Sequence, residues 1–142
     1  ISFKQYYQGS FTNMLRWHQL DGLWERVKAN PEGWYVYWVG KEVPTRPVAV
    51  EELNKFIEEV DKLLRHDHHY DYCGIVYADN PEFPAMVKIF DPHHLGSSCG
   101  SAGHAIPPGW ILTRIPPAPV VHEVILPENR KRWWQRLFPV RE

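Results

Sequence analysis

Histidine and cysteine side chains, which coordinate zinc-type metals and move protons near neutral pH, are concentrated in about a quarter of this chain. Six of the eight histidines and both cysteines lie between residues 66 and 104, in clusters at 66–73 and 93–104. The residues available to a shared site are His66, His68, His69, Cys73, His94, Cys99 and His104. Neither cluster has the ligand spacing of a metal finger. The residue types nevertheless predict one candidate function, a zinc-type metal site or a thiol-dependent enzyme.

The segment 91–108 is predicted to be a long loop, because its glycines and prolines interrupt any regular element. Small residues surround Cys99, and His94 or His104 could activate its sulfur as a thiolate nucleophile. A disulfide between Cys73 and Cys99 is the other interpretation of the two cysteines.

Charge is unevenly distributed along the chain. Residues 48–91 carry ten acidic side chains and four basic ones, whereas residues 119–142 carry five basic and three acidic. The basic end also holds large apolar side chains, and its candidate partner-binding residues are Arg130, Arg132, Trp133, Trp134, Arg136, Leu137 and Phe138. Because tryptophan and arginine dominate interface energetics, this tail predicts binding to another protein or to a second subunit.

Other kinds of partner are not expected. Nucleic acid is disfavoured because the acidic middle of the chain would repel phosphates, and contact of the tail with a membrane surface is not expected either. No apolar run reaches the roughly 20 residues that span a bilayer. The chain has 142 residues and two cysteines, which favours a single ordinary domain in the cytoplasm.

Hydrophobic periodicity predicts most of the elements. The strongest pattern is an amphipathic helix over 49–65, with apolar residues from Val50 to Leu64 on one face and acidic and basic residues on the other. Residues 11–29 are expected to form one further helix or two short ones. Strands are expected at 34–39, 72–78, 85–90 and 110–115, with a hairpin turn at 79–82 and an edge strand over 42–48.

These elements predict an α+β fold: a small antiparallel sheet of about five strands with two main helices packed on one face. Residues 1–116 would form this domain. Residues 117–142 would form a Pro-rich extended linker, with a short strand over 120–126, and a tail that ends in a short basic helix over 128–138.

The preferred functional interpretation is a non-catalytic accessory protein without a cofactor. Its basic aromatic tail, together with the 91–108 loop, would engage another protein. The alternative is the metal-binding or thiol-dependent enzyme with the histidine and cysteine residues named above, and its cofactor would be zinc.

Overall fold

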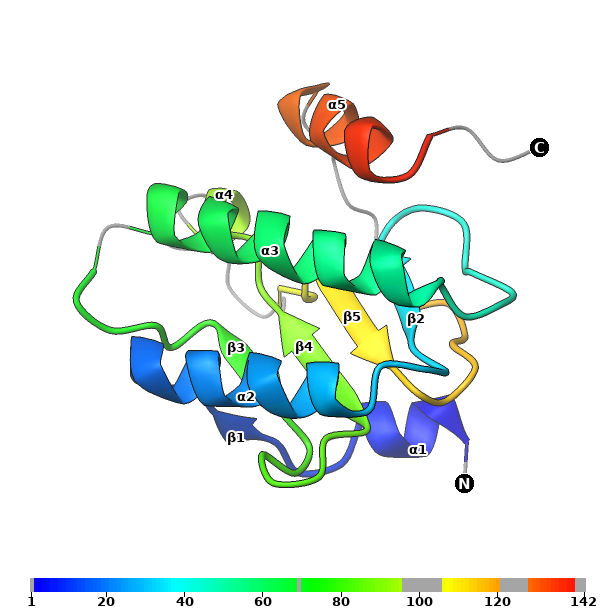
Figure 1. The fold of residues 1–142 in the computed structure, drawn as a ribbon, viewed down its shortest axis with the longest axis horizontal. Coiled ribbons are helices and arrows are strands. Elements are labelled where there is room, and N and C mark those ends of the chain that lie inside the picture. The colour runs from blue at the N-terminus through cyan, green and yellow to red at the C-terminus, as the bar shows by residue number, and fades with distance from the viewer. Residues whose placement is uncertain (1, 69, 96–105, 121–127, 140–142) are drawn as a thin grey trace.

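The computed structural model describes residues 2–68, 70–95, 106–120 and 128–139 (Figure 1). Its helices are α1 (Phe3–Tyr7), α2 (Trp17–Ala29), α3 (Val50–Asp67), α4 (Pro92–Leu95) and α5 (Glu128–Leu137). Its strands are β1 (Thr12–Asn13), β2 (Tyr35–Trp38), β3 (Val76–Ala78), β4 (Met86–Ile89) and β5 (Trp110–Thr113).

The strands of these described residues form one sheet in the order β1-β3-β4-β5-β2, and every neighbouring pair is antiparallel. This arrangement confirms the predicted α+β class with a five-stranded antiparallel sheet. The predicted turn between β3 and β4 is held by the side chains of Asp79 and Asn80. Asp79 accepts hydrogen bonds from the amides of Ala85 and Met86, and Asn80 accepts them from the two amides that follow Pro81.

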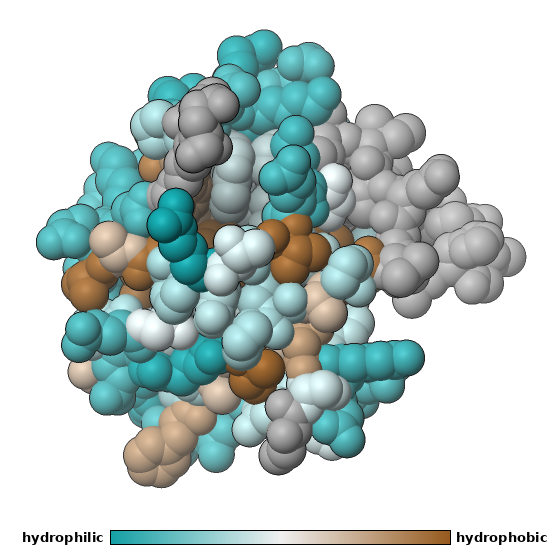
Figure 2. Space-filling model, turned by 90° about the vertical axis from the view of Figure 1, so that its right-hand side faces the viewer, coloured by the Kyte–Doolittle hydropathy of each residue, from teal (hydrophilic) through white to brown (hydrophobic). Residues whose placement is uncertain are grey.

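The predicted edge strand over 42–48 is wrong, because this segment is an irregular connection between β2 and α3. Pro44 and Pro47 lack the amide donors that a strand needs. The two ends of the connection are hydrogen-bonded to the β2 region. The Lys41 amide donates to Trp38 of β2, and the Val48 amide donates to Trp34, the residue before β2. The side of the molecule that carries this connection is a mixed surface, with apolar patches (brown) among hydrophilic residues (teal) (Figure 2).

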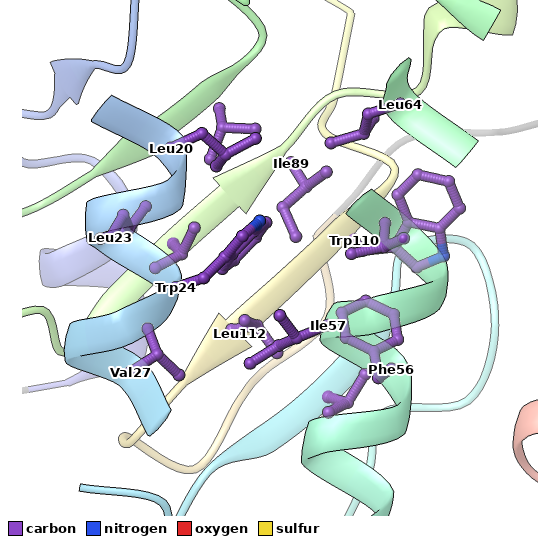
Figure 3. Packing of buried hydrophobic residues seen from close by; sticks show 14 of the residues in the cluster. Leu20, Leu23, Trp24, Val27, Phe56, Ile57, Leu64, Ile89, Trp110 and Leu112 are labelled. Carbon is purple, nitrogen blue, oxygen red and sulfur yellow. The ribbon is translucent and has the colours of Figure 1, made fainter. Parts of the chain in front are cut away.

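Helices α2 and α3 lie on the same face of the sheet (Figure 1), and the core fills the space between them and the strands (Figure 3). The apolar stripe of α3 is buried as predicted, from Leu53 to Leu64. Helix α2 contributes Leu20, Leu23, Trp24 and Val27. Side chains on alternate positions of the strands, such as Ile89 and Leu112, face these helices because successive strand residues point to opposite sides of a sheet.

A second apolar cluster covers the opposite face of the sheet. It consists of Phe3, Tyr37, Val39, Met86 and Ile111. Phe3 comes from α1, a short helix that the sequence pattern does not predict. The Ser2 hydroxyl accepts a hydrogen bond from the Gln5 amide, and the Gln5 side chain accepts one from the Ser2 amide, which caps the first turn.

The helix predicted over 11–29 begins later than expected, at Trp17. Residues Thr12 and Asn13 instead form β1, which pairs with Ala78 and Tyr77 of β3. Tertiary pairing therefore overrides the local helical pattern at these positions. Most of the strand predicted over 120–126 lies outside the described residues. None of the helices in the described ranges is long and apolar enough to cross a membrane.

Candidate functional site

Helix α5 is attached to the rest of the chain by one buried cation. The Arg130 guanidinium donates to both oxygens of Asp91, at 2.9 and 3.0 Å, and to Oδ2 of Asp67 at 2.7 Å. Both Arg130 and Asp91 are buried. Burial alone would lower the pKa of Arg130, but Asp91 and Asp67 outweigh it and raise this pKa, so the guanidinium stays charged.

Asp67 lies at the end of α3 and receives two hydrogen bonds, from Arg130 and from His66. Burial would raise the pKa of Asp67, but these bonds to His66 and Arg130 and the positive charge of Arg130 together lower it. The carboxylate therefore stays ionised beside the guanidinium. This network holds three segments together: the end of α3, the residue before α4, and α5.

Aromatic side chains complete the attachment of α5. Trp133 is buried against Phe56 of α3 and Trp110 of β5, with ring centroids 6.2 and 5.4 Å apart. Trp134 packs on Trp38 of β2 at 5.2 Å and on Phe138 at 4.5 Å. Adjacent residues of a helix point in directions about 100° apart, so Trp133 enters the core while Trp134 stays half-buried at its rim.

A groove of about 490 Å³ lies where α5, β2 and the 41–48 connection meet. Its apolar surface comes mainly from Val36 and Trp38 of β2, from Trp134 and Phe138 at the tail, and from Val43, Pro44 and Val48 of the connection. Its charged lining residues are Lys41, Glu42, Arg46 and Lys131. The volume falls within the range of sites that hold a small molecule or a few residues of a peptide.

Three of the four charged side chains that line this groove are cations. Lys41 Nζ lies 5.8 Å from the centroid of the Trp38 ring, within the range of a cation–π contact. On α5, the lining residues Trp134, Gln135 and Phe138 follow Lys131 by three, four and seven positions and therefore share one face of the helix. The groove thus combines an aromatic wall with a mainly basic rim.

The residues predicted to bind a partner have different positions in the structure. Arg130 and Trp133 are buried within the chain, and Leu137 is half-buried against the same core. Trp134 and Phe138 line the groove. Arg132 and Arg136 are exposed on α5. The first group holds the helix in place, whereas the other two groups leave surface that a partner can reach.

The predicted metal and thiol residues are only partly described. His66 is exposed and contacts Asp67. His68 is buried, and its Nε2 lies 2.8 Å from the carbonyl oxygen of Cys73. Because a carbonyl oxygen only accepts, this nitrogen carries the proton and donates, so it has no lone pair for a metal. Among the described residues, no group of three or more His, Cys, Asp or Glu side chains is placed to hold a metal ion.

Cys73 is a buried thiol. Burial raises its pKa above the ordinary 9.0, against the lowering effect of the nearby backbone amides. A thiol of raised pKa is a poor nucleophile near neutral pH. His69, Cys99 and His104 lie outside the described residues, and His94 falls in α4, so the zinc site, the Cys99 nucleophile and the Cys73–Cys99 bridge stay predictions.

Sequence reasoning missed most of the residues that line the groove. Trp134 and Phe138 were among the candidates, but Lys41, Arg46 and Trp38 were not, because no motif marks them. The one local signal is the combination of prolines with charged residues over 41–48, which is typical of an exposed connection. No family model, curated protein or solved structure matches this chain, so its function has to be inferred from its own residues.

Proposed function

We propose that this chain is a non-catalytic protein-interaction protein, and that the groove between α5, β2 and the 41–48 connection binds an acidic segment of a partner protein. The observation that carries the proposal is the composition of this groove, an aromatic wall with a basic rim. A cytoplasmic location and a basic tail helix that serves partner binding are part of the same proposal.

The charges of the groove indicate the sign of the partner segment. Lys41, Arg46 and Lys131 line it, against the single carboxylate of Glu42. The exposed Arg132 and Arg136 extend the positive surface along α5. Interfaces match positive patches with negative ones, which steers the encounter and excludes partners of the wrong charge. A segment rich in aspartate and glutamate is the best electrostatic match.

The aromatic residues indicate what else the segment must carry. Trp134 and Phe138 are half-buried and present ring surface at the groove, and the Trp38 ring, which is 4% exposed, lies at its base. Apolar side chains anchored in such pockets supply most of the affinity of an interface, while the charged rim contributes selectivity and association rate. We therefore expect one or two apolar residues flanked by acidic ones.

The proposal also explains why α5 is fixed so firmly. A binding wall has to be held in position before the partner arrives, because ordering it at the moment of binding would weaken the affinity. Arg130 and Trp133 provide this support from the buried side of the helix, through Asp91 and the Phe56 and Trp110 rings. The adjoining face of the helix, which carries Lys131, Gln135 and Phe138, stays available to a ligand.

Selection from a random peptide library tests the proposal. Peptides are selected on the wild-type protein and their affinities are measured by fluorescence anisotropy, with the Lys41→Glu/Lys131→Glu variant for comparison. The selected peptides should be acidic with apolar residues at their centre. Their Kd should rise about tenfold or more in this variant, because like charges would then face each other.

The matched control is the double variant Lys4→Glu/Lys28→Glu, which changes the net charge equally at exposed positions of α1 and α2. Its Kd should stay within about twofold of the wild type, since neither lysine lines the groove and the charge of an exposed residue is screened at physiological salt. Equal weakening by both variants would mean that net charge alone drives binding. Selected peptides without acidic residues would contradict the proposal outright.

A further inference from the structure

We infer that the partner segment binds as an added β-strand, paired through its backbone with the outer edge of β2. This inference rests on the proposed function of the same groove and specifies how the segment is held. It concerns backbone groups of β2, so it is separate from the charge argument for the groove.

The direction of the backbone groups of β2 follows from its pairing with β5. The Val39 amide donates to Gly109 at 2.9 Å, and the register continues with Tyr37 opposite Ile111 and Tyr35 opposite Thr113. In an antiparallel pair, alternate residues exchange hydrogen bonds with the partner strand, and the residues between them face away. The backbone groups of Trp34, Val36 and Trp38 therefore point to the free edge of the sheet.

Two hydrogen bonds confirm this direction. The carbonyl oxygen of Trp34 accepts from the Val48 amide at 2.9 Å, and that of Trp38 accepts from the Lys41 amide at 3.0 Å. Both donors belong to the connection outside β2. Residue 36 lies midway between these two carbonyls, and its own N–H and C=O have the same outward direction.

Val36 is the position at which an incoming strand would pair. Within the described residues, neither its outward N–H nor its C=O has a hydrogen-bond partner, and the same holds for the N–H of Trp38. Val36 is 4% exposed and lines the groove. Buried backbone groups are nearly always paired with protein or with water, so these groups favour an occupant that supplies a donor and an acceptor.

The groove also limits the length of the added strand. The connection closes the edge of the sheet at Trp34 and again at Trp38. The open stretch between them therefore fits about three residues of an extended chain, at roughly 3.3 Å per residue. A short extended segment can present three consecutive residues in this way, which is the mode known as β-strand addition.

Side-chain alternation connects this geometry with the chemistry of the groove. The side chains of Val36 and Trp38 lie on the face of the sheet that α3 and α5 cover. An apolar residue of the segment on this face would meet Trp38 and Trp134. Acidic residues before and after the three paired positions would meet the basic side chains at the ends of the groove, including Lys41 and Lys131.

The test uses a blocked heptapeptide, Asp-Glu-Val-Ile-Val-Glu-Asp, and two isomers of it that carry N-methyl groups on the odd-numbered or on the even-numbered residues. N-methylation removes amide donors and leaves the side chains and charges in place. Because only alternate amides of an added strand face β2, one isomer should lose about tenfold or more in affinity. The other isomer should bind within about threefold of the parent peptide.

A second readout comes from the protein itself. Amide hydrogen exchange of the uniformly labelled wild-type chain is followed by NMR, with and without the parent peptide. The Val36 amide should exchange at least about tenfold more slowly when the peptide is bound, because the peptide then covers it. The Tyr37 amide is the matched control, since it faces β5 in both states.

The outcomes separate this inference from the proposed function. If both isomers bind like the parent peptide and Val36 exchange is unchanged, while Lys41→Glu/Lys131→Glu weakens binding, the groove binds acidic segments through side chains only and strand addition is wrong. If the parent peptide does not bind, or if that variant binds it as well as the wild type does, both the proposed function and the strand addition fail.

Discussion

The Arg130 guanidinium and the Asp91 carboxylate form a bidentate pair between α5 and the residue that precedes α4, with distances of 2.9 and 3.0 Å. Both side chains are buried, and the second carboxylate, Asp67, contacts the guanidinium from α3. A fork of this geometry fixes the orientation of a helix as well as its position. The groove therefore depends on a buried contact of Arg130, which lies one helical turn before the groove residue Trp134.

Replacement of Arg130 by alanine should strongly destabilise the protein. The substitution leaves Asp91 buried without its cation, and loss of one partner of a buried ion pair typically costs about 3–5 kcal/mol. The free energy of unfolding, measured by urea denaturation with tryptophan fluorescence, should fall by an amount of this order. The tryptophan fluorescence of the folded variant should also differ from that of the wild type, because Trp133 and Trp134 lie on the helix that loses its anchor.

The exposed Arg132 of the same helix provides the matched control for this substitution. Arg132→Ala removes the same charge and should change the free energy of unfolding by less than about 0.5 kcal/mol. An Arg130→Ala variant as stable as Arg132→Ala would show that α5 is not held by the Asp91 contact.

The contribution of Asp67 to stability should disappear in acid. Its pKa is lowered in the folded protein from the ordinary 3.8, so the native state favours the ionised carboxylate. The resulting stabilisation is complete above pH 3.8 and is lost as the pH falls through the lowered pKa. Wild type and Asp67→Asn should therefore differ in free energy of unfolding at pH 6, and this difference should shrink towards pH 2. Denaturation at a series of pH values measures it, and a difference that grows in acid would contradict the assigned pairing.

Two parts of the fold were predictable from local patterns alone. Helix α3 presents an apolar stripe from Leu53 to Leu64 at helical spacing, and its observed boundaries lie within two residues of the predicted ones. The β3–β4 hairpin follows from Asp79 and Asn80, whose side chains bond the turn amides directly. In both cases the residues that specify the element are neighbours in the sequence.

The groove was not predictable because it depends on contacts between distant residues. Trp133 and Trp134 are chemically identical neighbours, and which of them is buried is decided by the rotation of α5 about its axis. That rotation is set by the pairing of Arg130 with Asp91, which lies 39 positions away. Likewise, Lys41 lines the groove because the 42–48 segment runs past the edge of β2 without forming a strand that pairs with β2.

Two glycine substitutions should have opposite effects on stability. Gly22 is inside α2, where alanine would be favoured by roughly 0.5–1 kcal/mol and its Cβ would meet only the flexible end of Arg26, at 3.3 Å. Gly74 has a φ of +73°, and a Cβ there would lie 3.2 Å from the Tyr72 ring. Gly74→Ala should therefore cost about 1–2 kcal/mol. Urea midpoints measure both changes, and a neutral Gly74→Ala would show that the loop before β3 relaxes freely.

The reactivity of Cys73 distinguishes a structural thiol from a catalytic one. Its sulfur is buried, and burial raises its pKa, so little thiolate exists at neutral pH and reagents reach it only after local opening. In a Cys99→Ser background, which leaves one thiol to count, Cys73 should react with a disulfide reagent about a hundredfold or more slowly in the native protein than in guanidinium chloride. Cys73→Ser should also lose stability, since it places a more polar hydroxyl within the buried hydrophobic cluster to which Cys73 belongs. If Cys73 reacts as fast in the native state as in the unfolded one, its thiolate is accessible. A thiol-dependent enzyme would then be the better interpretation of this chain than an interaction protein.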